Sequence, residues 1–385
     1  MNGIKPAIIV AAYNRDQSLT RLLKMLAGAR YVTKDIPLVI SIDGGGAEAV
    51  KTVADSFEWK HGEKTVISHD HNLGLREHIL RCGDLSDKYG AVIVLEDDLG
   101  VSNFFYQYAE QALEMFGGCQ DIAGVSLYKH LINVNCGSRF EPLDNGLGYY
   151  CMQFAQSWGQ MWTRDQWRAF RNWYDVEDNL NKPLDIPRFV NSWPESSWLK
   201  YFIRYVVDKN KYFVYPVKSQ TTNFSDMGTH MAQLNNNIYQ VPLAEYKLEL
   251  SRDVSTEVVH YDAYFEITEK SLRSFSKDLP QDSLIIDLYG IRNLENYPAS
   301  QLVLTTRSCD KRIKSWGFRY KPREMNIIQD LSGEMVSLCQ NKDISDQRRT
   351  EYLLREFTYD RRWLGSRDMM KLLSYSLLTR LFKKS

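Results

Sequence analysis

The chain has 385 residues, of which 44% are hydrophobic and 25% charged, so it is long enough for two domains with ordinary globular cores. Lysines and arginines balance aspartates and glutamates at a net charge of +0, which excludes broad electrostatic steering toward nucleic acid. The six scattered cysteines form no CxxC pair and no run of about 18 apolar residues occurs, so neither a zinc motif nor a membrane-spanning segment is indicated.

The first half of the sequence alternates short apolar runs with helical patterns. We expect strands over residues 7–12, 38–42, 65–68 and 91–95, because these apolar runs are too short for helices. Apolar side chains at helical spacing follow each run, and Asp16 stands where it can cap the first helix. This order predicts an α/β fold with a mixed, mainly parallel sheet and helices on both faces.

The second half of the sequence is less regular. Residues 124–240 are rich in tryptophan and tyrosine, a composition that often builds the cleft beside a regular scaffold. After about residue 240 the sequence turns to charged helical stretches and ends in a basic segment. We therefore expect a first domain over 1–240 and an α/β or helical C-terminal extension over 241–385.

Polar side chains follow the predicted strands. Asn14 and Arg15 come directly after the first strand, and Asp43 follows the second. Open α/β sheets bind ligands at the carboxyl ends of their strands. There, Asp43 can accept a hydrogen bond from a nucleobase or ribose, or it can serve as a turn-forming aspartate. Arg76 starts the helix after the third strand, where it can meet a diphosphate or remain an exposed surface arginine.

The most informative signal is a strand that ends in three acids. The apolar run 91–95 leads straight into Glu96, Asp97 and Asp98. Adjacent carboxylates repel one another, so we expect a cation or a set of hydrogen-bond donors to stabilise them. Oxygen ligands suit a hard ion such as Mg²⁺ or Mn²⁺, which in turn suits phosphate. The alternative is an acidic loop after a strand.

These residues, in this order, resemble a known group of enzymes. Asn14 and Arg15, then Asp43, then the carboxylate triplet are arranged similarly to the GT-A nucleotide-diphospho-sugar glycosyltransferases, over roughly residues 5–240. The triplet, followed by a short loop and the aromatic pair at 104–105, most resembles the animal N-acetylglucosaminyltransferase that starts complex N-glycans and its bacterial relatives. The resemblance implies a GT-A, Rossmann-like sheet.

The resemblance also implies roles for single residues. It implies that Asp98 ligates the Mn²⁺ or Mg²⁺ that bridges the donor diphosphate. Glu96 and Asp97 would hold donor-sugar and ribose hydroxyls, and Asp43 would contact the nucleoside. The donor site is then expected to comprise Asn14, Arg15, Asp43, Arg76, Glu96 and Asp97.

An inverting transfer needs a base that removes the proton of the acceptor hydroxyl. The family places this acid just ahead of a tryptophan, and Glu195 is the matching position, with Asp185 as its competitor. The alternative for Glu195 is a helix-start acid that interacts favourably with the helix dipole. His230 matches the loop with which the family closes its site, where it can ligate the metal or contact the diphosphate.

We therefore expect a metal-dependent, inverting glycosyltransferase that moves a hexose or N-acetylhexosamine from a UDP-sugar to a hydroxyl of a glycan acceptor. Residues 369–384 show a basic amphipathic pattern, typical of a helix on an anionic membrane surface or of one docked on the protein's own core. The expected transferase and the basic segment together predict a cytoplasmic enzyme on the inner face of the cell membrane. Its acceptor would be a lipid-linked glycan in bacterial surface polysaccharide synthesis.

Two alternatives stay open. A non-catalytic subunit of a membrane-associated assembly would bind glycan or nucleotide without consuming it. A sugar-1-phosphate nucleotidyltransferase would need a glycine-rich loop with a basic residue after the first strand, and residues 11–15 lack those glycines.

Overall fold

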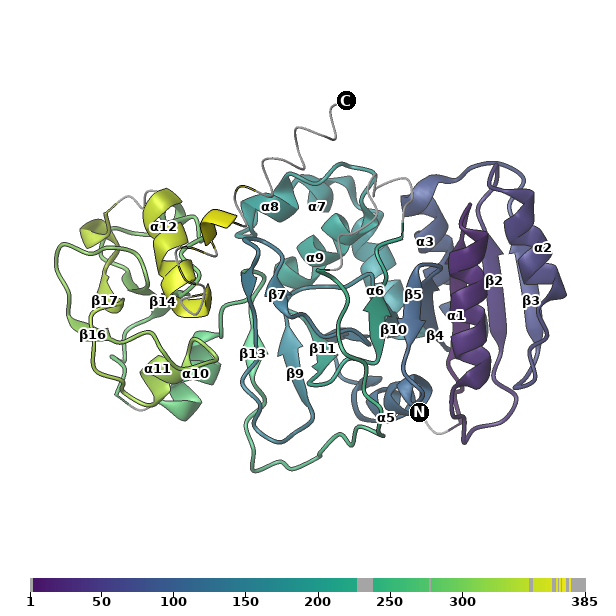
Figure 1. Cartoon of the computed structure of the whole chain (residues 1–385), viewed down its shortest axis with the longest axis horizontal. Coiled ribbons are helices and arrows are strands. Elements are labelled where there is room, and N and C mark those ends of the chain that lie inside the picture. Colours follow the sequence, from purple (N-terminus) through teal and green to yellow (C-terminus); the bar gives the residue numbers. More distant parts are fainter. Residues whose placement is uncertain are drawn as a thin grey trace. The chain divides into compact units, whose positions relative to one another are not determined.

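The computed structural model describes residues 3–226, 238–276, 278–345 and 349–361, with positions 365, 367, 369–371 and 374 beyond them. The chain forms two compact units, Met1–Lys277 with Ile291–Asn293, and Asp278–Gly290 with Leu294–Ser385 (Figure 1). The division falls after residue 277, later than the expected boundary at 240. The reason is that β13 (His260–Tyr261) pairs with β9 (Tyr149–Met152) and so joins the sheet of the first unit.

The first unit is built on a nine-stranded sheet of order β13-β9-β11-β6-β10-β4-β1-β2-β3. Most neighbouring strands run parallel, but β10 is antiparallel to both β4 and β6, and β9 is antiparallel to β11. The remaining strands of the sheet are β1 (Ala7–Ala12), β2 (Leu38–Ile42), β3 (Lys64–Ser68), β4 (Ala91–Glu96), β6 (Ile122–Ser126), β10 (Gln160–Thr163) and β11 (Tyr212–Pro216).

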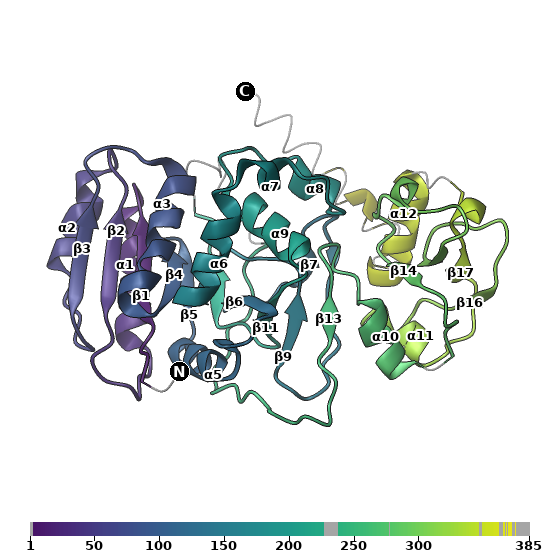
Figure 2. The same cartoon turned by 180° about the vertical axis from the view of Figure 1, so that it is seen from behind.

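Helices cover both faces of this sheet, as Figures 1 and 2 show from opposite sides. One face packs against α1 (Asp16–Gly28), α2 (Glu48–Ser56) and α5 (Phe105–Phe116). The other contacts α3 (Gly74–Asp84) and α6 (Arg164–Tyr174), which pack against α9 (Trp198–Asp208). Because β1, β2 and β4 are sandwiched in this way, their sequences read as continuous apolar runs. The predicted α/β fold class, with a mixed, mainly parallel sheet and helices on both faces, is confirmed.

Short elements complete the first unit. Two strands, β5 (Leu99–Val101) and β12 (Thr221–Asn223), form an antiparallel pair beside the main sheet, and β7 (Ile132–Asn133) pairs with β8 (Ser138–Arg139). The short helices are α4 (Ser86–Tyr89), α7 (Glu177–Asn181), α8 (Arg188–Asn191) and α10 (Glu269–Phe275).

One helix start differs from the prediction. Asp16 does not cap α1, because the backbone carbonyl of Arg15 accepts the Leu19 N–H and Arg15 therefore occupies the N-cap position. Asp16 instead lies in the first turn of the helix, where its charge still interacts favourably with the helix dipole.

The second unit has its own four-stranded sheet, of order β14-β15-β17-β16, so the α/β form of the expected extension is the one observed. Its strands are β14 (Leu284–Asp287), β15 (Leu302–Thr305), β16 (Lys314–Trp316) and β17 (Val336–Gln340). Its helical segments are α11 (Met325–Ile328), α12 (Arg349–Glu356), η1 (Leu294–Asn296), η2 (Asn341–Asp343) and the π-helical turn η3 (Phe357–Arg361). Across the described residues, none of the helices is long and apolar enough to cross a bilayer.

Candidate functional site

The loops after β1, β2 and β4 meet at one edge of the main sheet, because these parallel strands all end there. A cavity of about 580 Å³ lies at this edge. Most of the residues expected in the donor site line it together, namely Asn14, Arg15, Asp43, Glu96, Asp97 and Asp98. Residues that are up to 84 positions apart in the sequence thus share one cavity wall.

Arg15 neutralises part of the carboxylate triplet. Its Nη1 donates to Asp98 Oδ2 at 2.9 Å, and its Nη2 forms an ion pair with Asp97 Oδ1. Asp97 is 2% exposed and Asp98 is 7% exposed. One guanidinium therefore faces three carboxylates, which leaves the cluster short of positive charge when all three are ionised.

The shortage of positive charge changes the acidity of the triplet. Burial, and then the charge of Asp98, raise the pKa of Glu96 to about 8. Burial also raises the pKa of Asp97 to about 6, although Arg15 opposes that rise. The pKa of Asp98 is raised for the same reason, again against the effect of Arg15. The cluster therefore favours the uptake of a proton or of a cation near neutral pH.

One oxygen of the triplet is suited to a metal ion. In the part of the chain that the structure describes, Asp98 Oδ1 is buried and has no hydrogen-bond partner. A buried carboxylate oxygen with unused lone pairs is a suitable ligand for a hard divalent cation. The described residues contain no group of three or more histidine, cysteine or acidic side chains arranged to hold a metal by themselves. Asp98 thus fits a cation that takes its other ligands from elsewhere.

Asp43 joins two loops of the site. Its Oδ1 accepts the N–H groups of Gly44 and Leu73 at 2.8 Å each, and its Oδ2 accepts that of Gly74 at 3.1 Å. The carboxylate, which is 5% exposed, therefore fixes the start of α3 against the end of β2. It has a turn-forming contact and a place in the cavity wall at the same time.

The glycines after Asp43 are required by the protein's own backbone. A Cβ on Gly44 would lie 2.3 Å from the carbonyl group of His71, and one on Gly46 would lie 2.0 Å from the carbonyl oxygen of Tyr13. These close approaches bring the loops after β1, β2 and β3 together.

Arg76 and Glu195 lie outside the carboxylate cavity. Arg76 Nη1 donates to the backbone carbonyl of Glu195 at 2.6 Å. The side chain of Glu195 is exposed, in the turn before α9, and Ser197 caps that helix. A neighbouring pocket that includes Arg76 and Ser196 shares Gly74 and Leu75 with the cavity, so the two hollows adjoin.

The other two predicted residues are placed differently. Asp185 accepts hydrogen bonds from the Tyr264 hydroxyl at 2.8 Å and from Arg292 at 3.1 Å, which fixes both of its oxygens. His230 lies outside the described residues.

Several lining residues were not predicted. His78, whose Nε2 lies 2.8 Å from the Ser41 hydroxyl, lines the cavity, and burial lowers its pKa to about 4, so it is neutral at pH 7. Asn223 and Ser225 reach the cavity from the loop at the end of β12. Trp158 and Tyr239 form an aromatic wall, with ring centroids 4.4 Å apart. The sequence signal for these residues was their place in segment 124–240, which was expected to build the cleft and contains Trp158, Asn223, Ser225 and Tyr239; His78 had no such signal.

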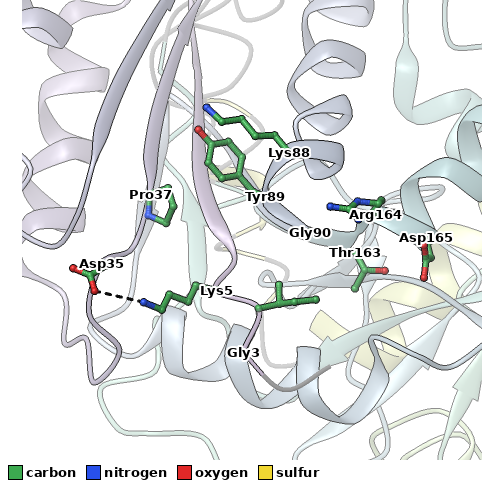
Figure 3. A pocket seen from close by; sticks show the side chains of 11 residues that line it. Gly3, Lys5, Asp35, Pro37, Lys88, Tyr89, Gly90, Thr163, Arg164 and Asp165 are labelled. Carbon is green, nitrogen blue, oxygen red and sulfur yellow. Dashed lines mark ion pairs between the residues drawn. The ribbon is translucent and has the colours of Figure 1, made fainter.

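A second pocket lies at the opposite edge of the sheet, where β1 and β4 begin (Figure 3). It is lined by Lys5, Lys88 and Arg164 together with Asp35 and Asp165, and Lys5 pairs with Asp35 at 3.6 Å. Its mixed and partly paired charges contrast with the clustered acids of the first cavity.

No family model and no curated protein matches the chain. Among solved structures, S. aureus TarS 1–349 in complex with UDP-GlcNAc is 12% identical with a TM-score of 0.36, over 60% of this chain and 61% of that one. Mouse xyloside xylosyltransferase 1 is 11% identical with a TM-score of 0.36, over 55% and 84%. A mannosyltransferase of Pyrobaculum calidifontis in complex with GDP-Man and Mn²⁺ is 11% identical with a TM-score of 0.30, over 42% and 46%.

A second TarS structure, with a longer chain than TarS 1–349, is matched over 36% of its length. This chain therefore spans less than two thirds of the TarS structures. Similarities of this size leave the function to be argued from the site itself.

Proposed function

We propose that this chain is a metal-dependent, inverting glycosyltransferase that transfers a sugar from a UDP-sugar to a hydroxyl of a glycan. The observation that carries the proposal is the acidic triplet at the end of β4, in one cavity with Arg15 and Asp43 and with a buried, unpartnered oxygen on Asp98. A nucleoside diphosphate, a divalent cation and a sugar together supply what this cavity lacks, namely positive charge beside the acids and hydrogen-bond donors for them.

Different loops bind different parts of the donor. Asp43 and Asn14 contact the nucleoside side, where neutral His78 adds a donor or acceptor at the cavity wall. Glu96 and Asp97 accept hydrogen bonds from sugar and ribose hydroxyls. Asp98 offers Oδ1 to Mn²⁺ or Mg²⁺, and His230 is a further candidate ligand. When bound, such a cation neutralises the charge that grows on the leaving diphosphate.

Glu195 is the proposed base. Its side chain is exposed beside a hollow that adjoins the cavity, and its backbone is fixed by Arg76, so it can be held near an acceptor hydroxyl. A carboxylate in that place removes the hydroxyl proton as the hydroxyl attacks the anomeric carbon. Asp185 is less suited, because Tyr264 and Arg292 already occupy its two oxygens.

Trp158 and Tyr239 form the kind of aromatic wall on which a sugar ring can stack. A lipid-linked glycan in bacterial surface polysaccharide synthesis, reached from the cytoplasmic face of the membrane, stays our proposal for the acceptor. Most of segment 369–384, the expected membrane contact, lies outside the described residues.

A donor screen tests the proposal directly. The full chain is incubated with Mn²⁺ and a panel of nucleotide sugars, and release of nucleoside diphosphate is followed with and without a chelator. We expect release from one UDP-sugar that the chelator abolishes. Thermal stabilisation by a UDP-sugar that is never consumed, even with a range of glycan acceptors, would instead favour a non-catalytic binding subunit.

The base is tested by a matched pair of variants. Glu195→Gln should lower turnover by at least about a hundred-fold, because base catalysis contributes factors of that order. Asp185→Asn should lower the melting temperature by loosening the contact with Arg292 and leave turnover within a few-fold. The reverse pattern would transfer the role to Asp185.

A further inference from the structure

Arg15 occupies carboxylates that a metal ion would need. Its guanidinium bridges Asp97 and Asp98 with one nitrogen on each, and the Asp98 bond is 2.9 Å long. The opposite oxygen of Asp98, Oδ1, is the buried atom that has no partner in the described structure. One oxygen of the Asp98 carboxylate therefore contacts the Arg15 guanidinium, and the other is a buried acceptor without a hydrogen-bond partner among the described residues.

A second cation at Oδ1 would come close to that guanidinium. Both positive charges would share one carboxylate, and like charges at such a separation repel strongly when solvent is partly excluded. As long as Arg15 contacts Asp98, a divalent ion should therefore bind this site more weakly than three neighbouring acids would suggest.

Arg15 is placed where it can move away from Asp98. Its side chain is 21% exposed, whereas those of Asp97 and Asp98 are 3% and 10% exposed, so the arginine reaches the aspartates from the open side of the cavity. A guanidinium binds phosphate oxygens with the same two-pronged geometry that it uses for carboxylates. Transfer from Asp98 to a diphosphate in the same cavity would exchange one anionic partner for another.

We propose that Arg15 is a resident counter-ion that releases Asp98 when a nucleoside diphosphate binds, so that the divalent cation binds tightly only together with the diphosphate. The proposal rests on the proposed function, because it takes the nucleoside diphosphate as the ligand of this cavity. Arg15 thereby has a positioning role: the arginine neutralises Asp97 and Asp98 in the free protein and sets the order in which the site fills.

Direct metal binding tests the proposal without turnover. Mn²⁺ is titrated into the full chain, with and without UDP, and free Mn²⁺ is read from its electron paramagnetic resonance signal. In the unchanged chain, UDP should tighten Mn²⁺ binding by at least about ten-fold, within the usual range of coupling between sites. Arg15→Gln should tighten Mn²⁺ binding in the absence of UDP by about ten-fold and should reduce the coupling by a similar factor.

Two further variants separate the role of Arg15 from general effects of charge and folding. Arg81→Gln removes a positive charge from an exposed pair with Glu77 on α3 and should leave Mn²⁺ binding within about two-fold. Arg15→Lys keeps a positive charge beside the acids, so it should bind Mn²⁺ as weakly as the unchanged chain does in the absence of UDP. Arg15→Lys also serves as a test if Arg15→Gln does not fold. If Arg15→Lys bound Mn²⁺ about ten-fold more tightly than the unchanged chain does, that result would contradict the counter-ion role.

The outcomes distinguish this inference from the proposed function. Equal Mn²⁺ affinity with and without UDP, or an Arg15→Gln variant that binds Mn²⁺ no more tightly, would overturn the counter-ion role even if the chain consumes a UDP-sugar. The expected Mn²⁺ pattern in a chain that consumes none of the nucleotide sugars, even with a range of glycan acceptors, would support the counter-ion role and contradict the proposed transferase.

Discussion

Arg15 in the first unit and Arg323 in the second both hold acids away from bulk solvent, but the balance of charge around them differs. Arg323 donates from Nη1 and Nη2 to the two oxygens of Glu356, at 2.8 and 2.6 Å, and its guanidinium lies 4.0 Å from the ring centroid of Tyr289. Arg323 directs both of its terminal nitrogens to one carboxylate, with Arg355 also nearby, whereas Arg15 is shared by two aspartates and also faces Glu96. A matched buried pair fixes a fold, and a mismatched one retains charge for a ligand.

The largest expected effect comes from removing the charge of Asp98 at the mismatched site. Asp98→Asn should lower metal-dependent release of nucleoside diphosphate by at least about a hundred-fold, because charge stabilisation of several kcal/mol is lost. Folding should be unimpaired or improved, since one of three repelling carboxylates becomes neutral. As a control, Asp87→Asn breaks only an exposed pair with Arg168 and should leave turnover unchanged. Full turnover in Asp98→Asn would remove the contrast between the two regions.

The matched site should show the opposite response. Arg323→Met leaves Glu356 without its partner and should lower the free energy of unfolding by about 3–5 kcal/mol, as is usual when one half of a buried pair is lost. The double variant Arg323→Met with Glu356→Leu should recover much of that loss, because neither Arg323 nor Glu356 is left buried without the other. Denaturant unfolding measures both. If the double variant lost as much free energy of unfolding as the two single variants together, the pair would have a role beyond balancing charge.

The smallest expected effect is a pH dependence of stability above about pH 6.5, where Glu96 of the mismatched site should dominate. The buried His78 and His130, whose pKa values are lowered, no longer titrate there in either state. Glu96 has a pKa of about 8 in the folded chain against an ordinary value of 4.5, so between these values the folded state holds a proton that the unfolded chain has released. Stability should therefore fall as pH rises from about 6.5 to 8 in the presence of a chelator.

Melting temperatures measured across this pH window, with and without Mn²⁺, check the expectation. Glu96→Gln should flatten the profile, since its side chain does not titrate. Mn²⁺ should stabilise the unchanged chain more at the alkaline end, because the cation binds ionised carboxylates. A profile that Glu96→Gln leaves unaltered would assign the pH dependence to other groups.

The scaffold of the site was predictable because its information is local. The bounds 7–12 and 38–42 match β1 and β2, since strands covered on both faces leave mostly apolar runs in the sequence, broken here only by Ser41. The acids of the triplet directly follow such a run, so their place at the sheet edge followed from the direction of β4.

The rest of the site depends on contacts between distant parts of the chain. Arg76 was expected either to meet a diphosphate or to be an exposed surface arginine, and its contact with the carbonyl of Glu195, 119 residues away, could not be read from the sequence. Asn223 and Ser225 line the cavity because β12 pairs with β5, a contact that no periodicity in the sequence reveals. The roles of Glu195 and His230 remain predictions.

The reversed strand β10 has a consequence for how the cleft is encoded. Because Gln160 pairs with Val94, near the end of β4, the residues just before β10 lie at the same edge as the residues just after β4. Trp158 thus joins a wall opposite the acids from a separate stretch of chain. A change in the length of segment 153–159 can therefore reshape one wall while the ends of β1, β2 and β4 keep their places, so that the two sides of the cleft can diverge independently.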